Sequence, residues 1–274
     1  MSGVAVTVLL PVYNGEAYVG KAIESILTQS YGDIELLVID DGSKDSTPEI
    51  LTRYLASDAR VRVLRHDNHG VGYTLNRGMR EARGRFIAEL GADDLALPGR
   101  LEKQVAFMEE HPDYVAVGGY LSIVDLEDHP IGLRTYPTTD ERLRASMLLF
   151  NPFGSPAIMY RRDDALAAGG YTARFSTCED YDFLLRLATR GKVANLPEPL
   201  TAYRFHGSST KSTKTIRALR DTVSIKRVAF AEYGYRPTMA ARAVNTAQGV
   251  LAHLPAGVAY WLFNKIFIRA ECTS

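Results

Sequence analysis

The sequence predicts an α/β fold with a mostly parallel central sheet, and three observations support this prediction. Continuous apolar runs at Val4–Leu10, Ile34–Ile39 and Phe86–Leu90 are typical of strands buried on both faces of a sheet. Segments with apolar residues at helical spacing follow these runs, which favours repeated strand–helix units. Of the 274 residues, 46% are apolar, so the chain can bury a substantial core.

The first 120 residues are expected to alternate between strands and helices. The first strand leads into a helix over Glu16–Gln29, where apolar residues recur at helical spacing. The second strand ends in Asp40 and Asp41, and Ser46 or Thr47 can cap the helix that follows. The remaining elements expected in this half are a strand over Val61–Leu64, a helix over Tyr73–Glu81 and the strand Phe86–Leu90.

Beyond Pro98 the pattern becomes mixed. A helix over Glu179–Thr189 is expected because its apolar residues lie on one face, and the polar run Phe205–Lys214 reads as a mobile loop. Two or three basic amphipathic helices should occupy the rest of the chain. The other elements expected here are a helix over Leu101–Glu110, strands over Val115–Val117 and Leu121–Val124, and a helix over Asp140–Phe150.

The charge is balanced overall but unevenly distributed. The chain has 32 basic and 32 acidic residues, so the whole molecule offers no field that would attract nucleic acid. From Lys211 onward, ten basic residues stand against three acidic ones, and the preceding part carries the matching acidic surplus.

The cysteines and the chain ends indicate a cytoplasmic protein. Cys178 and Cys272 lie far apart without metal-type spacing, so we expect a reducing compartment and no disulfide framework. The run Val4–Leu10 lacks a basic leader and reads as a strand, not a signal peptide. The apolar segment Val258–Ile268 is interrupted by polar residues and is too short to span a bilayer.

Two pairs of acids follow two of the expected parallel strands. Asp40 and Asp41 end one strand, and Asp93 and Asp94 follow another, so both pairs should lie at the same edge of the sheet, where open α/β sheets bind ligands. Carboxylates repel a diphosphate unless a divalent cation lies between them. The pairs therefore suggest a metal carrying a diphosphate. The alternative is that each pair caps its turn or helix, which Asp does well.

Four segments, taken in order, resemble the signatures of the family 2 glycosyltransferases. The similarity runs from about Val4 to about Thr213. It implies a GT-A fold, which is a Rossmann-like, mostly parallel sheet flanked by helices. It also implies transfer of a sugar from a nucleotide diphosphate sugar, usually UDP-linked, with inversion at the anomeric carbon. The segments are Leu10–Asn14, Val38–Ser43, Ala92–Leu101 and the pair Glu179–Asp180.

The resemblance assigns the nucleotide site to the ends of the first two strands. Pro11, Val12 and Tyr13 match the segment that lines the base. Asp41, with Asp40 beside it, matches the acid that accepts a hydrogen bond from the uracil imide, a suitable role because a carboxylate is only an acceptor.

The resemblance also assigns the metal site. Asp93 and Asp94 occupy the D-x-D region, with Asp94 as the main ligand of Mn²⁺ or Mg²⁺ and Asp93 as a second ligand or ribose contact. Gly91 stands where many members have a further Asp, so the metal shell is expected to be thinner.

Asp180 matches the general base of the family. An inverting displacement needs a carboxylate that takes the proton from the acceptor hydroxyl. Glu179 would be its orienting neighbour at the substrate. The alternative is that Asp180 only stabilises the first turn of its helix.

A late segment is expected to close over the diphosphate. His206 would supply a metal ligand or meet phosphate, and Arg204 and Lys211 would add positive charge at the leaving group. The alternative for His206 is an inert surface histidine.

These assignments divide the chain into a catalytic domain and an extension. Residues 1–215 would form the domain, with the nucleotide sugar bound by about 1–120 and a saccharide or lipid-linked acceptor by about 121–215. Residues 216–274 would form a basic amphipathic helical extension. Its aromatic end could dock on the inner face of an anionic membrane, form a homodimer, or pack on the domain.

Two other functions were weighed against transfer. A nucleotide-sugar-binding protein without activity would have no use for Asp180. A nucleotidyltransferase usually begins with a glycine-rich phosphate loop, which Pro11–Gly15 lacks.

Overall fold

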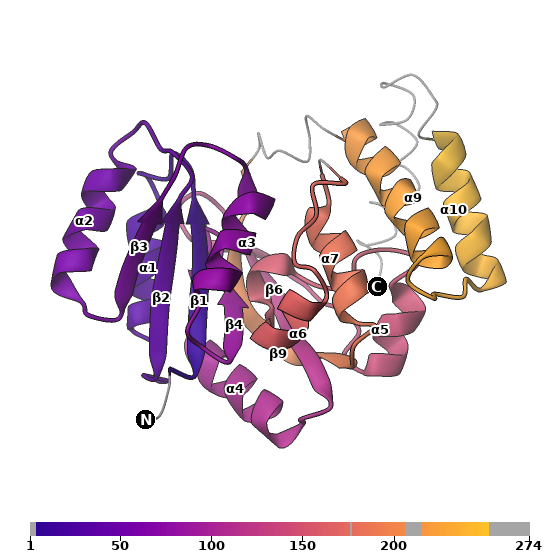
Figure 1. Cartoon of the computed structure of the whole chain (residues 1–274), viewed down its shortest axis with the longest axis horizontal. Coiled ribbons are helices and arrows are strands. Elements are labelled where there is room, and N and C mark those ends of the chain that lie inside the picture. Colours follow the sequence, from indigo (N-terminus) through magenta and orange to yellow (C-terminus); the bar gives the residue numbers. More distant parts are fainter. Residues whose placement is uncertain (1–3, 176, 207–214, 252–274) are drawn as a thin grey trace.

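The computed structural model describes residues 4–175, 177–206 and 215–251. In this part of the chain, nine strands form one sheet in the order β3-β2-β1-β4-β8-β6-β9-β5, with β7 paired to β6 (Figure 1). The strands are β1 (Val6–Val12), β2 (Ile34–Asp40), β3 (Val61–Arg65), β4 (Phe86–Glu89), β5 (Leu95–Ala96), β6 (Tyr114–Val124), β7 (Pro130–Arg134), β8 (Met159–Arg161) and β9 (Lys192–Arg204).

Helices cover both faces of the sheet. They are α1 (Val19–Leu27), α2 (Thr47–Ser57), α3 (Val71–Glu81), α4 (Arg100–Glu110), α5 (Asp140–Ser146), α6 (Arg162–Ala167), α7 (Glu179–Leu187), α9 (Thr215–Ala231) and α10 (Met239–Leu251), with the 3₁₀ turn η1 (Ser155–Ala157) before β8.

The amino-terminal half confirms the expected parallel winding. Strands β3, β2, β1 and β4 pair in parallel. Successive residues of β1 face opposite sides, so Val8 and Leu10 join a core with α1 and α2, while Leu9 joins a second core with α3 and α7. Burial on both faces explains why these strands appear in the sequence as continuous apolar runs.

The second half of the sheet departs from the sequence prediction. Strand β6 is one strand where two were expected, and the helix from Asp140 ends at Ser146 and not at Phe150. Strands β5, β7, β8 and β9 and helix α6 were not expected. The strand β8 runs antiparallel to β4 and β6, whereas β9 runs parallel to β6, so six strands of the sheet still share one direction.

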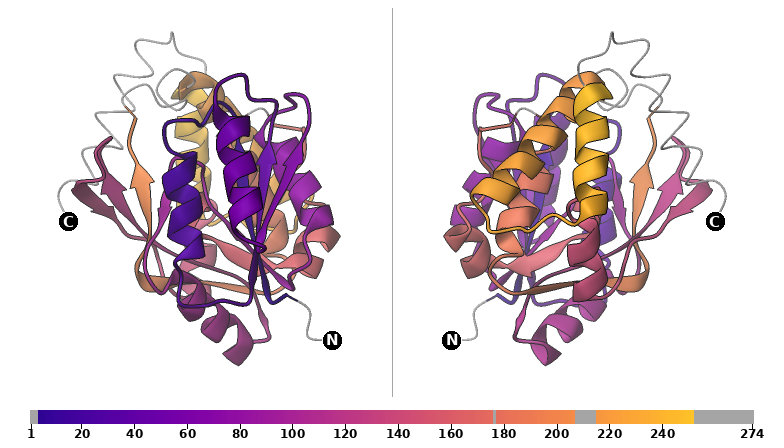
Figure 2. Two further views of the ribbon diagram at one scale, coloured as in Figure 1. Left: turned by 90° about the vertical axis from the view of Figure 1, so that its left-hand side faces the viewer. Right: turned by 90° about the vertical axis from the view of Figure 1, so that its right-hand side faces the viewer.

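The helical hairpin α9–α10 lies beside α7, at the end of the molecule opposite α2 (Figures 1 and 2). Helix α9 packs on α7, and Ile225, Ala229 and Ala241 of the hairpin belong to the same core as α3 and α7. None of the helices in the described ranges is long and apolar enough to cross a bilayer.

Several sequence expectations lie outside the described residues. These are most of the Phe205–Lys214 loop, including Lys211, the apolar segment Val258–Ile268 with its aromatic residues, and Cys272. Cys178 is a free thiol.

Candidate active site

The turns after β1 and β2 interlock at the carboxyl edge of the parallel strands. The backbone N–H of Asp41 donates to the carbonyl of Val12 at 2.8 Å. Asn14 has a positive φ of 50°, and its side-chain oxygen accepts a hydrogen bond from the backbone of Lys44 at 2.9 Å. Pro11 and Val12 are largely enclosed by these turns, whereas Tyr13 is 49% exposed. The predicted base-lining segment is thus held rigidly, with Tyr13 open to a ligand.

The carboxylates of Asp40 and Asp41 are buried and hold backbone groups. Asp41 accepts hydrogen bonds from the backbone N–H groups of His69 and Gly70 at 2.8 and 2.9 Å. Asp40 accepts one from the backbone of Ser43 at 2.8 Å, as a turn cap would. Asp41 therefore orients the segment that leads into α3.

An aromatic cluster lies beside Asp41 that the sequence did not predict. The rings of His69 and Tyr73 are 4.5 Å apart, and the ring of His66 lies 5.2 Å from that of Tyr73. His66 Nδ1 is 3.3 Å from Asp41 Oδ1. Only the turn at Gly70, whose φ is 89°, brings these residues together, so their spacing in the sequence gave no signal.

The second acid pair lies where β4 ends. Asp94 is buried, and its Oδ1 accepts a hydrogen bond from the backbone N–H of Arg204 at 3.0 Å. Burial, together with the neighbouring charge of Asp93, holds the pKa of Asp94 well above its usual range. Asp93 Oδ2 lies 3.0 Å from His206 Nε2. Asp93 and Asp94 are adjacent in the chain, and His206 contacts Asp93. The three residues predicted to hold the metal therefore lie close together.

Gly91 leaves space that the two carboxylates occupy. A Cβ at this position would lie 2.5 Å from Asp94 Oδ2 and 3.0 Å from Asp93 Oδ1. Two carboxylate oxygens therefore point into one small space, and their mutual repulsion would be relieved by a cation. The donor set fits a hard divalent ion. Even so, no group of three or more His, Cys, Asp and Glu side chains in the described ranges is arranged to hold a metal.

The guanidinium of Arg204 points into the protein, although we expected it to face the leaving group. It is 1% exposed, and it donates to the carbonyls of Asp93 and Asp125 at 2.9 and 3.0 Å and to the carboxylate of Asp128. The guanidinium carbon of Arg204, Cζ, lies 4.5 Å from the centre of the Tyr18 ring. In this arrangement Arg204 supports the backbone that carries the acid pair.

Asp180 has one oriented oxygen and one available oxygen. Its Oδ2 accepts hydrogen bonds from Asn151 Nδ2 at 3.2 Å and from the hydroxyl of Ser155. Among the described residues, none donates to Oδ1. Asp180 lies in the first turn of α7, next to Glu179, and both side chains are half-buried. Neither oxygen accepts a backbone N–H group of α7, so Asp180 is not a hydrogen-bonding cap of its own helix.

A buried acid network behind the site was also missed by the sequence. Glu89 Oε1 accepts hydrogen bonds from the hydroxyls of Tyr160 and Tyr171 at 2.6 and 2.7 Å. Burial raises the pKa of Glu89 to about 7, and the charge of Asp180 acts in the same direction. Arg100, also buried, donates to the carbonyl of Glu89 at 2.8 Å. Glu89 looked like part of an ordinary strand, so nothing in the sequence marked it.

The hydroxyl of Tyr203 is influenced by the acids at both predicted sites. Burial raises the pKa of this hydroxyl, and the charges of Asp94, Asp93 and Asp180 act in the same direction.

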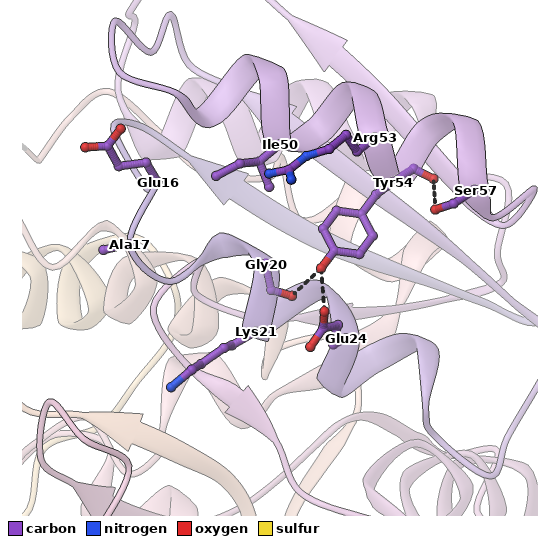
Figure 3. A pocket seen from close by; sticks show the side chains of 9 residues that line it. All are labelled: Glu16, Ala17, Gly20, Lys21, Glu24, Ile50, Arg53, Tyr54 and Ser57. Carbon is purple, nitrogen blue, oxygen red and sulfur yellow. Dashed lines mark hydrogen bonds between the residues drawn. The ribbon is translucent and has the colours of Figure 1, made fainter.

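A separate groove of about 450 Å³ lies between α1 and α2 (Figure 3). Its lining includes Lys21, Arg53 and Tyr54, whose hydroxyl donates to Glu24 Oε1 at 2.7 Å. None of the predicted site residues lines this groove.

Comparisons with known proteins show the family to which this chain belongs. Residues 7–168 match the model of a protein family described as glycosyl transferase family 2. An uncharacterized glycosyltransferase of Haemophilus influenzae is 31% identical, with the match covering 81% of this chain and 72% of the relative. The O-antigen biosynthesis glycosyltransferase WbnJ of Escherichia coli is 30% identical, with coverage of 76% and 82%.

Solved structures share the fold. The Pyrobaculum calidifontis mannosyltransferase PcManGT, in complex with GDP-Man and Mn²⁺, is 17% identical with a TM-score of 0.66, and the match covers 100% of this chain and 76% of the other. TarS 1-349 of S. aureus, in complex with UDP-GlcNAc, is 18% identical with a TM-score of 0.61 and coverage of 81% and 66%.

Proposed function

This chain belongs to glycosyl transferase family 2, and on that premise we propose that it is an inverting enzyme of the GT-A type. It moves a sugar from a nucleotide diphosphate sugar to a hydroxyl group of an acceptor. The observation that carries the proposal is the carboxylate of Asp180, which has one oxygen held by Asn151 and Ser155 and the other without a donor among the described residues.

In the proposed reaction Asp180 is the general base. Oδ1 accepts the proton of the acceptor hydroxyl while that oxygen attacks the anomeric carbon on the face opposite the leaving diphosphate. Asn151 and Ser155 fix the carboxylate so that little orientation is lost when the acceptor arrives. A single displacement of this kind inverts the anomeric configuration, and Glu179, beside Asp180 in the first turn of α7, would orient the base at the substrate.

The donor site is assigned to about residues 1–120, with Tyr13 and the aromatic cluster beside Asp41 next to the base. We assign a UDP-linked donor on the family resemblance, in which the carboxylate of Asp41, an acceptor only, would accept a hydrogen bond from the uracil imide. The fold neighbours were solved with UDP-GlcNAc in one case and GDP-Man in the other, which supports the nucleotide diphosphate sugar class without choosing the base.

We assign Mn²⁺ or Mg²⁺ to Asp94 and Asp93, with His206 at its edge. When bound, the ion would offset the negative charge of the diphosphate. The support is the pair of carboxylate oxygens that share the space beside Gly91 and the raised pKa of Asp94. Arg204 acts indirectly, by fixing the backbone of Asp93 and binding Asp94 through its own N–H.

We assign the acceptor, a saccharide or a lipid-linked sugar, to about residues 121–215. The name of the E. coli relative refers to O-antigen biosynthesis, which supports a role in polysaccharide or glycolipid assembly in the cytoplasm. Peripheral membrane contact and dimerisation through the basic carboxyl-terminal part are the two partner arrangements that follow from its charge.

Release of nucleoside diphosphate from a panel of nucleotide sugars tests this function. Asp180→Asn should lower kcat by about 10²- to 10⁴-fold, because the base is lost, while nucleotide binding is retained. Asp163→Asn, at an exposed acid in the first turn of α6, is the matched control and should leave kcat unchanged. Full activity of Asp180→Asn, or no turnover of any donor by the wild type, would contradict the proposal.

A further inference from the structure

Helix α9 touches both of the segments that hold Asp180. It packs along α7, and its neighbour in the hairpin, α10, lies on its other side (Figure 1). The segments in question are the turn before α7 and the stretch 147–151 that carries Asn151. In the sequence, α9 begins 35 residues after Asp180, and no motif marks it.

The first contact fixes the turn that leads into Asp180. Asp221 Oδ2 of α9 accepts hydrogen bonds from the backbone N–H and the hydroxyl of Thr177 at 2.9 and 2.8 Å. The next residue, Cys178, caps α7 with a φ of 61°, a left-handed conformation that costs a non-glycine residue energy. Asp221 therefore helps to hold a strained turn two residues before Asp180.

The second contact fixes the segment that carries Asn151. The ammonium of Lys226 is fully buried, and it donates to the carbonyl of Leu149 at 2.7 Å and to Gln248 Oε1 of α10 at 2.8 Å. Leu149 is two residues before Asn151, which binds Asp180 Oδ2. Lys226 thus connects the helical hairpin to the group that orients the base.

Stability alone does not account for a lysine at this position. In the described part of the chain, no carboxylate lies within ion-pair distance of Lys226, and burial lowers its pKa to about 8. An uncompensated buried charge is costly, and an apolar side chain of similar volume is often neutral or stabilising. What the lysine adds is a directed bond to the carbonyl of Leu149.

We propose that Lys226 and Asp221 are positioning residues for Asp180: Lys226 holds the 147–151 segment through Leu149, and Asp221 holds the turn before α7 through Thr177. Through these two contacts the hairpin acts on the position of the base. This inference rests on the proposed function, because it takes Asp180 as the base.

The test compares Lys226→Met, Lys226→Arg and Asn151→Ala in transfer assays, nucleotide-binding assays and thermal melts. Lys226→Met should remain folded and bind UDP as the wild type does, while kcat falls about tenfold, since small misplacements of reacting groups are costly. Lys226→Arg retains donors and should recover part of the loss. Lys103→Met, at an exposed lysine paired with Glu198, is the matched control and should retain full kcat.

Two readouts separate positioning from a merely structural role. The first is the split between kcat and KM: Lys226→Met should lower kcat while the KM for the donor stays at the wild-type value, because only the position of Asp180 changes. The double variant Lys226→Met/Asn151→Ala should lose no more activity than Asn151→Ala alone, because both changes act on one path.

The outcomes are distinguishable. If the wild type turns over no donor, the proposed function fails and the positioning role fails with it. If Asp180→Asn is inactive but Lys226→Met keeps the wild-type kcat, or if the double variant is additive, only the positioning role is overturned. Should Lys226→Met fail to fold, Thr177→Val removes one bond to Asp221 and must lower kcat without changing UDP affinity.

Discussion

The carboxyl group of Glu89 is buried, and its Oε1 accepts hydrogen bonds from the hydroxyls of Tyr160 and Tyr171. Its pKa is about 7 in the folded protein, against an ordinary value of 4.5. As the pH rises from about 4.5 to 7, the unfolded chain releases this proton while the folded chain retains it, so folding becomes less favourable. Glu89 therefore contributes most to the free energy of unfolding below pH 4.5, and its contribution is smallest above pH 7.

Glu89→Gln removes this pH dependence. Relative to the variant, the wild type should lose up to about 3 kcal/mol of unfolding free energy between pH 4.5 and 7, as the pKa difference implies. Urea titrations at a series of pH values measure the effect, with the exposed Glu81→Gln as control. Parallel curves for wild type and Glu89→Gln would show that Glu89 ionises normally in the fold.

Gly91 illustrates how a departure from a family pattern acquires a physical meaning. The sequence suggested a missing metal ligand, whereas the structure shows that a side chain there would collide with the carboxylate of Asp94. Gly91→Ala should displace that carboxylate and weaken Mn²⁺-supported UDP binding by about 10- to 100-fold, the range seen when groups that orient a metal ligand are lost.

Titration calorimetry with UDP and Mn²⁺ measures the effect of Gly91→Ala. Gly32→Ala serves as the control, because a Cβ at Gly32 would meet nothing within 4 Å. Unchanged affinity in Gly91→Ala would mean that Asp94 does not hold the metal in the present rotamer.

The candidate site was predictable in part at this scale. Asp93 and Asp94 could be named because paired acids at a strand end stand out in the sequence, and Asp180 could be named because it matches the motif of the resembled family. Asn151 and Ser155 could not be assigned to Asp180, since they meet it across a loop that no periodicity describes. Glu89 was hidden because its neighbours form an ordinary buried strand.

At the scale of elements, strand β9 does more than extend the sheet. It ends at Arg204, which bonds the backbone of Asp93 and, through its own N–H, the carboxylate of Asp94. The strand thereby holds in place the acid pair that is proposed to bind the metal. The sequence did not reveal β9, because Pro197 and Pro199 interrupt its pattern and shift its register against β6.

Arg204→Met should destabilise the protein by about 3 to 5 kcal/mol, because the part-buried carbonyls of Asp93 and Asp125 lose a charged donor and, among the residues that the structure describes, Asp128 keeps only Lys21 as an ion-pair partner. Arg134→Met, in the exposed strand β7, is the matched control and should cost under about 1 kcal/mol. Chemical denaturation measures both. A small loss in Arg204→Met would mean that water replaces the guanidinium in this position.

At the scale of the whole molecule, the order of the strands in the sheet determines where the candidate site forms. Strands β3, β2, β1 and β4 were readable because parallel strands are apolar throughout. The exposed strand β7 and the three-residue strand β8 could not be predicted, because they are defined by pairing with distant strands and not by a local residue pattern. Because β8 reverses direction beside β4, the loop with Asn151 and the helix with Asp180 come to border the end of the parallel half.

The proposed donor site is formed only when the sheet is folded. Binding of the donor nucleotide should therefore stabilise the folded protein. A ligand that binds only the folded state stabilises it by about 2.7 kcal/mol at 100 times its dissociation constant. UDP with Mn²⁺ should therefore raise the melting temperature by several degrees, whereas UDP with EDTA should give a much smaller rise. Asp94→Asn should abolish the part that depends on Mn²⁺, and Asp163→Asn should retain it. An equal rise with EDTA would mean that the acid pair does not act through a metal, and the role of Asp94 would then reduce to its bond with the backbone of Arg204.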